Sequence, residues 1–302
     1  MPQLWQTLDQ ILYRQGEINM ESMQSPILKL RNYYPSLTKT EKKIADVVFD
    51  KGEEIIYRSI TEFAEMCKVS ETTIVRLCRR LGLSGYQEFK LVLARDVVVP
   101  KKELCDDIDM ASNLNTLVQI VTQQNVQAIN NTMRIISLDE LENAIELIVN
   151  ANHIEIYGVG ASGYTALDVS YKFKRIGLQV AAQTDPHIQS MSASLLQKGD
   201  VVLAISFTGS TRDLVNSVEI AKEAGAKVIC ITNHGKSPAA DLADVLLLSS
   251  VKETPLQSGA LSSKIAHLHI IDLLYSGTVV KIREKATKSI NITAAAVSNK
   301  LF

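Results

Sequence analysis

Residues 201–215 read Val-Val-Leu-Ala-Ile-Ser-Phe-Thr-Gly-Ser-Thr-Arg-Asp-Leu-Val. The apolar run that opens this stretch is typical of a buried parallel strand. It ends in a turn with several hydroxyl side chains and one glycine, and an amphipathic helical pattern at 214–224 follows at once. Such a turn directs hydroxyls and backbone N–H groups at a helix N-terminus, where the helix dipole favours an anion. The stretch therefore predicts a strand–helix unit with a phosphate-binding turn.

Short β-rich runs alternate with helical patterns throughout the C-terminal half. The runs that we predict as strands are 154–158, 178–182, 201–206, 228–232 and 245–248. The helical patterns between and after them are 162–175, 187–197, 212–224, 237–242 and a long apolar one at 262–283. Alternation of this kind predicts a doubly wound, five-stranded parallel sheet. Ligands of such sheets bind beyond the carboxyl ends of the strands.

The N-terminal part, from about 27 to 95, has a helical pattern instead. Thr38-Lys-Thr-Glu41 and Ser59-Ile-Thr-Glu62 are capping boxes, in which a hydroxyl and a carboxylate satisfy backbone donors at a helix start. They predict helices at 39–50 and 60–67. The fold class is therefore an all-helical N-terminal domain followed by an α/β domain.

Residues 60–80 predict a helix-turn-helix. A tight turn at Cys67-Lys-Val69 is followed by a helix that ends at Arg80 and directs Ile74, Leu77 and Cys78 to a core. The second helix of this motif lies in the major groove, where hydroxyls suit base edges and arginines suit guanine or phosphate. The residues that we expect at DNA are Ser70, Thr72, Thr73, Arg76, Arg79 and Arg80.

Charge agrees with a local DNA contact. The 302-residue chain has a net charge of -1, so it is not a globally basic polymer binder. Residues 22–98, however, carry 13 lysines and arginines against 10 acidic residues. On spacing alone, a three-helix bundle with a solvated basic face is the alternative.

The four scattered cysteines and the lack of a long apolar run predict a cytoplasmic protein without a membrane span.

A second candidate ligand turn follows the first predicted strand. Gly158-Val-Gly-Ala-Ser-Gly163 satisfies the G-x-G-x-x-G pattern of dinucleotide sites. Those sites expect an acidic residue roughly 20 positions on, and Asp185 fits this role only loosely. Two phosphate-type turns on neighbouring strands favour one compact phosphorylated ligand over a dinucleotide.

Longer stretches carry a family resemblance. Leu37-Thr-Lys-Thr-Glu-Lys-Lys-Ile-Ala45 and Val69-Ser-Glu-Thr-Thr-Ile-Val-Arg-Leu-Cys-Arg-Arg-Leu-Gly-Leu-Ser-Gly-Tyr-Gln-Glu-Phe-Lys90 resemble the N-terminal domain of the RpiR family of bacterial transcriptional regulators. Residues from about 145 to 280 resemble the sugar isomerase (SIS) domain that follows it in that family. The resemblance implies double-stranded operator DNA and a sugar phosphate as partners, and a homodimer or homotetramer.

The resemblance also implies which residues hold the ligand. The phosphate would be held by the hydroxyls of Ser206, Thr208 and Thr211 and the backbone of Phe207, Gly209 and Ser210. Ser162 would bind the phosphate or a sugar hydroxyl, and His187 and Glu253 would lie near the sugar. No cofactor and no metal are expected.

Each assignment has a plainer alternative. The hydroxyl-rich turn could merely cap a helix, and His187 and Glu253 could be solvated residues without a ligand. His267 and His269 lie on an apolar helical pattern and are expected to be packing or interface residues.

Three functions follow from these alternatives. The first is a regulator, with a lean towards a repressor that an amino-sugar 6-phosphate relieves. The second is a sugar-phosphate isomerase with an accessory helical domain, in which His187 or Glu253 would move a proton. The third, an NAD-dependent enzyme, depends on the glycine pattern alone. The helix-turn-helix favours the regulator, because an isomerase has no use for one.

The expected domain limits follow from these patterns. We expect an N-terminal extension at 1–21, the DNA-binding domain at 22–98, a linker with connecting helices at 99–140, the SIS domain at 141–285 and a C-terminal tail at 286–302. The helical patterns at 113–135 and 262–283 are candidate dimer surfaces.

Overall fold

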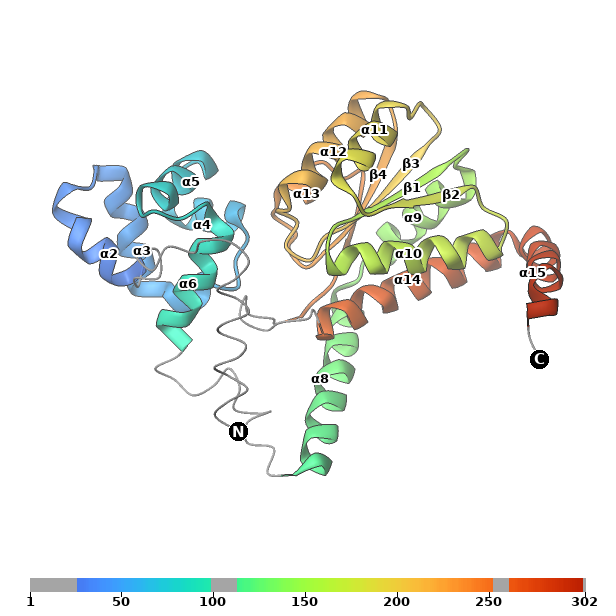
Figure 1. Cartoon of the computed structure of the whole chain (residues 1–302), viewed down its shortest axis with the longest axis horizontal. Helices are drawn as coiled ribbons and strands as arrows, with labels where there is room; N and C mark the ends of the chain where they lie inside the picture. The colour runs from blue at the N-terminus through green and yellow to red at the C-terminus, as the bar shows by residue number, and fades with distance from the viewer. Residues whose placement is uncertain (1–25, 99–112, 252–260, 301–302) are drawn as a thin grey trace. The chain divides into compact units, whose positions relative to one another are not determined.

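The computed structural model describes residues 26–98, 113–251 and 261–300, which form two compact units (Figure 1). The first is all helical, as predicted. The helical elements of residues 26–98 are α2 (Pro26–Tyr33), a 3-10 turn (Tyr34–Ser36), α3 (Lys39–Ile55), α4 (Ile60–Cys67), α5 (Glu71–Arg80) and α6 (Tyr86–Val98).

Both predicted capping boxes are present within residues 26–98. At the start of α3, the Thr38 N–H donates to the Glu41 carboxylate at 2.8 Å and the Glu41 N–H donates to the Thr38 hydroxyl at 3.3 Å. Ser59 and Glu62 make the equivalent pair before α4. The core beneath these helices includes Phe63, whose ring is stacked 5.5 Å from that of Tyr86.

The second unit is a parallel sheet with helices on both faces, as predicted. Its strands are β1 (Ile154–Gly158), β2 (Val180–Gln183), β3 (Val201–Ile205), β4 (Lys227–Thr232) and β5 (Val245–Leu248). They pair in the order β2-β1-β3-β4-β5, and every pair is parallel. Every residue of β1 and β3 is buried. Burial on both faces explains the unbroken apolar sequence of β3, whereas β1 contains one buried carboxylate, Glu155.

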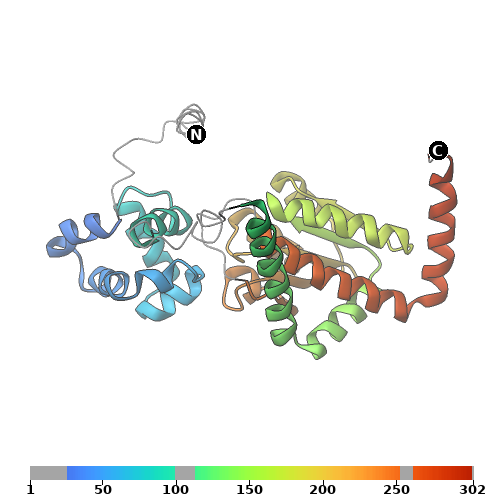
Figure 2. The same cartoon turned by 90° about the horizontal axis from the view of Figure 1, so that it is seen from below.

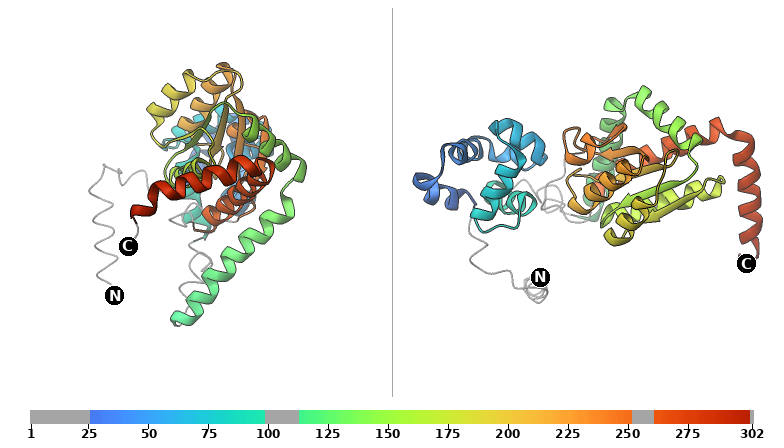
Figure 3. Two further views of the ribbon diagram at one scale, coloured as in Figure 1. Left: turned by 90° about the vertical axis from the view of Figure 1, so that its right-hand side faces the viewer. Right: turned by 90° about the horizontal axis from the view of Figure 1, so that it is seen from above.

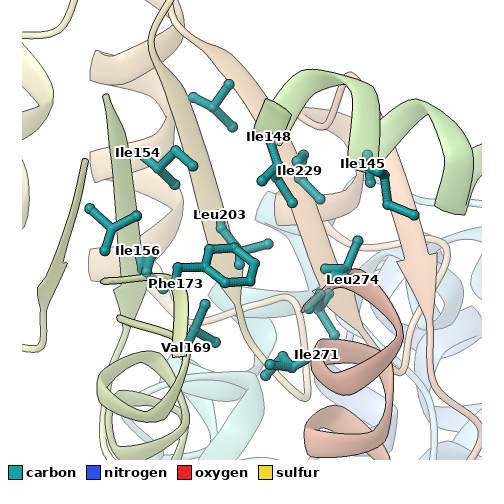
Figure 4. Packing of buried hydrophobic residues seen from close by; sticks show 14 of the residues in the cluster. Ile145, Ile148, Ile154, Ile156, Val169, Phe173, Leu203, Ile229, Ile271 and Leu274 are labelled. Carbon is teal, nitrogen blue, oxygen red and sulfur yellow. The ribbon is translucent and has the colours of Figure 1, made fainter. Parts of the chain in front are cut away.

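Helices cover the sheet in two layers. The helices of this unit are α8 (Leu114–Ile135), α9 (Leu138–Asn150), α10 (Ala161–Arg175), α11 (Pro186–Ser194), α12 (Arg212–Glu223), α13 (Pro238–Asp241), α14 (Leu261–Lys281) and α15 (Arg283–Val297). On one face, Ile148, Phe173 and Leu274 from α9, α10 and α14 pack against strand residues such as Leu203 (Figure 4). On the other face, α11 and α12 cover a second apolar cluster.

Most of the C-terminal tail expected at 286–302 is helical, because α15 occupies 283–297. The chain bends by 109° between α14 and α15, as Figure 2 shows. Ala286 is fully buried in the core of the α/β unit, and the Thr293 hydroxyl donates to the Arg175 carbonyl at 3.4 Å. α15 is therefore an integral part of this unit.

α14 is mainly a core helix. Ala266, Ile270, Ile271 and Leu274 are fully buried, since α8, α9 and α10 pack around it. The N-terminal half of α8 extends beyond the rest of the unit (Figure 3). Leu114 and Val118 are exposed there, and Val126, Met133 and Ile135 are exposed further along the helix. α8 therefore retains the apolar surface expected of a dimer contact, and α14 mostly does not.

No single helix among the described residues is long and apolar enough to cross a membrane; α14 and α15 pass such a test only as a bent pair.

Three of the cysteines are buried. They are Cys67, Cys78 and Cys230, and burial raises the pKa of each thiol to about 12. Cys105 lies outside the described residues.

Candidate functional site

The two predicted ligand turns follow neighbouring strands. β1 and β3 are hydrogen-bonded partners, with Gly158 opposite Ile205 at their carboxyl ends. The strand order reverses between these two strands, since β2 lies on one side of β1 and β3, β4 and β5 lie on the other. A reversal of this kind is the usual ligand position in an open α/β sheet. Both turns therefore belong to one candidate site.

The turn after β3 is tightly organised by its hydroxyl groups. Ser206 is buried, and its Oγ accepts from the Gly209 N–H at 3.1 Å and lies 3.3 Å from Thr211 Oγ1. Thr208 Oγ1 accepts from the Ser210 N–H at 3.2 Å. Gly209 has φ +60, and a Cβ atom there would overlap the Ser237 hydroxyl. This position therefore requires glycine.

The hydroxyls of this turn are not used as a simple helix cap. Thr211 is the N-cap of α12, but its side chain makes no capping hydrogen bond. By contrast, the N-cap side chains of Thr38, Ser70 and Ser137 each accept from a backbone N–H of their own helix. Capping alone therefore does not account for the hydroxyls after β3, and the first N–H groups of α12 have no side-chain acceptor from Thr211.

The turn after β1 has a similar helix start. Gly160 is the N-cap of α10, with φ +60 and no side chain to cover the first N–H groups of the helix. A Cβ atom on Gly158 would overlap the backbone of Ser162, so glycine allows the helix to approach the strand end closely. Ser162, half-buried in the first turn of α10, lies at this edge of the sheet.

Asp185 is the N-cap residue of α11. Its Oδ1 accepts from the His187 N–H at 2.9 Å and from the Ile188 N–H at 3.0 Å. His187 itself is exposed in the first turn of α11, just beyond the carboxyl end of β2. This arrangement argues against the dinucleotide alternative, because the acidic residue that it needs serves as a helix cap.

Sequence reasoning did not identify Gln189, which joins these elements. Its side chain is fully buried, and Nε2 donates to the Gly158 carbonyl at 3.1 Å and to the Gln183 carbonyl at 2.8 Å. The first turn of α11, with His187, is thereby fixed to the ends of β1 and β2. A glutamine in an amphipathic helix gives no sequence signal for this long-range contact.

His267 lies beside the turn after β3. Its ring is centred 6.4 Å from that of Phe207, and its Nε2 lies 3.2 Å from Ser249 Oγ. Burial lowers the pKa of His267 to about 4, so its imidazole is neutral at neutral pH. The prediction that His267 is a packing residue agrees with this environment.

Glu253 lies outside the described residues, but the segment before it is well anchored. Asn233, after β4, accepts from the Val251 N–H at 2.7 Å and donates to the Val251 carbonyl at 3.1 Å. The Ser250 N–H donates to Thr132 Oγ1 of α8 at 3.1 Å. Ser250 and Val251, which follow β5, are thus held by α8 and by the residue that follows β4.

The predicted DNA-binding helix is α5. Its buried residues are Ile74, Leu77 and Cys78, as the sequence predicts. The Ser70 side chain caps the helix by accepting from the Thr73 N–H at 3.3 Å. Thr72, Arg76 and Arg79 are exposed, so α5 carries hydroxyl and guanidinium groups to solvent.

Arg80 differs from the other residues expected at DNA. Arg80 Nη1 donates to Glu41 Oε2 at 2.8 Å and Nη2 donates to the Ser36 carbonyl at 3.3 Å. Arg80 is therefore engaged by two acceptors within the helical unit.

Two family models match the chain. Residues 25–98 match the helix-turn-helix domain of the rpiR family, and residues 147–277 match the SIS domain. An uncharacterised HTH-type transcriptional regulator of Caldanaerobacter subterraneus is 38% identical over 246 residues, covering 82% of this chain and 87% of the relative. The HTH-type transcriptional regulator RpiR of Escherichia coli is 33% identical over 273 residues, covering 90% of this chain and 92% of the relative.

Solved structures agree with these matches. The Vibrio vulnificus NanR protein complexed with ManNAc-6P has a TM-score of 0.80 and 29% identity, and the alignment covers 91% of this chain and 99% of NanR. The sugar isomerase domain of an RpiR transcription factor from Sphaerobacter thermophilus shares the fold, with a TM-score of 0.54 and 21% identity over 59% of this chain and 97% of that domain. The chain belongs to the RpiR family of helix-turn-helix transcriptional regulators and carries a C-terminal SIS domain.

Proposed function

We propose that this regulator binds a sugar phosphate in its SIS domain and that binding changes its affinity for operator DNA. The observation that carries the proposal is the pair of phosphate-type turns at the ends of β1 and β3, in a chain that also has exposed arginines on a recognition helix. An enzyme needs the same phosphate anchor, but it has no need of α5. The relatives named as transcriptional regulators support a sensing role over turnover.

We assign the phosphate to the turn after β3. The hydroxyls of Ser206, Thr208 and Thr211 would donate to it, together with the backbone of Phe207, Gly209 and Ser210. Ser162 would approach from the turn after β1. The dipoles of α10 and α12 both favour an anion between their N-termini. His187 and Glu253 would contact the sugar.

An amino-sugar 6-phosphate is the effector that we propose. The likeness to NanR, which was solved with ManNAc-6P, supports this class. We further propose that the chain is a cytoplasmic repressor, acts as a homo-oligomer on paired half-sites, and contacts DNA through Ser70, Thr72, Thr73, Arg76 and Arg79. Relief of repression requires that the effector bind the DNA-free arrangement more tightly than the DNA-bound one.

The test begins with ligand binding. A panel of sugar phosphates is screened for a rise in the melting temperature of the full chain, since a ligand that binds the folded state stabilises it. The best ligand is then added to the protein bound to a duplex that the wild type selects from a random-sequence pool. We expect Ser206→Ala combined with Thr208→Ala to abolish the melting shift and the ligand response while DNA binding is retained.

A matched control and a turnover assay complete this test. Ser194→Ala removes an exposed hydroxyl on α11 that bonds only locally, to the Met191 carbonyl, and should leave the response intact. A ligand response that persists in the double variant would contradict the assignment of the phosphate site. Conversion of the bound sugar phosphate between aldose and ketose forms would favour the isomerase.

A further inference from the structure

Glu41 serves two elements of the helical unit at once. Its carboxylate accepts from the Thr38 N–H at 2.8 Å and from the Thr38 hydroxyl at 2.9 Å, which completes the N-terminal cap of α3. The same oxygen, Oε2, accepts from Arg80 at 2.8 Å. Only 7% of the Glu41 side chain is exposed. The cap of α3 is therefore also the acceptor for the last turn of α5.

Arg80 attaches the end of α5 at two points. Its guanidinium bridges Glu41 and the Ser36 carbonyl, which belong to α3 and to the 3-10 turn before it. A planar guanidinium with two acceptors fixes an orientation, whereas a lysine ammonium holds a single point. Burial raises the pKa of Glu41, but its hydrogen bonds with Thr38 and Arg80 outweigh this and lower it, so the Glu41 carboxylate is ionised at neutral pH.

Neighbouring arginines of α5 differ in their surroundings. Arg76, Arg79 and Arg80 are all exposed, with 41% of the Arg80 side chain accessible, but two N–H donors of Arg80 are bound to protein acceptors. An arginine that binds DNA phosphate must have donors available for the phosphate oxygens. The two acceptors of Arg80 therefore suggest a second role beside the DNA contact that the sequence predicts, since its other donors remain available.

We propose that Arg80 is a positioning residue for DNA recognition: its bridge to Glu41 and Ser36 sets the orientation of α5, so that Thr72, Thr73 and Arg76 meet base edges. This inference depends on the proposed DNA-binding function. Loss of the bridge lets α5 tilt, which costs affinity for the preferred sequence and little affinity for other sequences.

Two conservative variants separate positioning from phosphate binding. Arg80→Lys keeps the positive charge but cannot hold both acceptors. Glu41→Gln removes the negative charge and keeps the α3 cap, because glutamine also functions at this position of a capping box. Arg80→Met removes the charge altogether. Arg134→Lys, in the last turn of α8, is the control for an arginine-to-lysine change elsewhere in the chain.

The full-length protein is titrated with two duplexes at several salt concentrations. One duplex is selected by the wild type from a random-sequence pool, and the other is a shuffled version of it. We expect Arg80→Lys and Glu41→Gln each to weaken binding to the selected duplex by about tenfold, within the range that one base contact is worth. Binding to the shuffled duplex should change less than about twofold, with the same salt slope.

Two further results distinguish a bridge between Arg80 and Glu41 from a direct phosphate contact of Arg80. If Arg80 and Glu41 act as one bridge, combining Arg80→Lys with Glu41→Gln should weaken binding no more than either change alone. If Arg80 contacts phosphate directly, Arg80→Lys should bind DNA nearly as well as wild type. Arg80→Met should then bind both duplexes more weakly, with a salt slope lower by about 1, and this result would overturn the proposal. Melting temperatures identify any variant that fails to fold, and the Lys and Gln variants then decide the question. If the wild type selects no sequence at all, DNA recognition and the role of Arg80 are both overturned.

Discussion

Gly209 shows how a single residue shapes the phosphate turn. Its φ of +60 lies in the left-handed region, and the space where a Cβ atom would lie is filled by the Ser237 hydroxyl. The Ser206 hydroxyl also accepts from its N–H, so a shift at Gly209 would move the hydroxyl that we assign to phosphate binding.

We expect Gly209→Ala to lower the free energy of unfolding by about 2–4 kcal/mol, from left-handed strain and overpacking together. Gly235→Ala is the matched control, because its Cβ would meet only the Leu248 side chain at 3.4 Å. That variant should stay within about 0.5 kcal/mol of wild type. Urea denaturation measures both, and equal effects at the two glycines would contradict this account of the turn.

At the scale of elements, α15 is the part of the fold that the sequence did not predict. The chain breaks after α14 at Ile282, which has φ -109 and no capping side chain, so neither glycine, proline nor a hydroxyl signals a new helix. Only tertiary packing defines α15, through Ala286 in the core.

We expect Ala286→Asp to destabilise the α/β unit by about 3 kcal/mol or more, because it places an unpaired charge in an apolar core. Ala295→Asp, on the exposed part of the same helix, should have an effect within about 0.5 kcal/mol. Thermal unfolding of the two variants tests whether α15 is integral. Similar melting temperatures for both would mean that α15 does not contribute to the core.

The first and last residues of most other elements could be predicted to within one or two positions, because buried strands and capped helices have characteristic local sequence patterns. The larger differences lie at helix ends: α3 extends to Ile55 instead of 50, and α11 ends at Ser194 instead of 197. The second strand shows how such a difference arises: it begins at Val180 instead of 178. Gly177, with φ +81, and Leu178 close the end of α10, where the Leu178 N–H donates to the Phe173 carbonyl at 3.2 Å. Leu178 is therefore buried as part of a helix terminus, which its apolar character alone could not distinguish from a strand.

The candidate site was predictable only in part, for a similar reason. Ser206, Thr208 and Thr211 follow a strand directly, so their place at the sheet edge could be derived from the strand alone. The contacts of Gln189 and Arg80 join residues that are far apart in the sequence, and no local pattern reports them.

For the whole molecule, the proposed regulation implies reciprocity between its two binding sites. If the sugar phosphate weakens DNA binding by some factor, DNA must weaken sugar-phosphate binding by the same factor, typically about 5–150-fold. Calorimetric titration of the ligand into free protein and into the protein–DNA complex measures both. Equal ligand affinity in the two titrations would show that the domains are not coupled, even if each binds its own partner.

The buried thiols provide a separate measure of order in each unit. Only a thiolate reacts readily with an electrophile, so Cys67, Cys78 and Cys230 become modified when their surroundings open. In a Cys105→Ser background, the labelling rate of Cys230 reports opening of the α/β unit, and those of Cys67 and Cys78 report opening of the helical unit. Mass spectrometry of the labelled peptides would then show, within one experiment, whether an effector tightens the domain that binds it, the domain that reads DNA, or both.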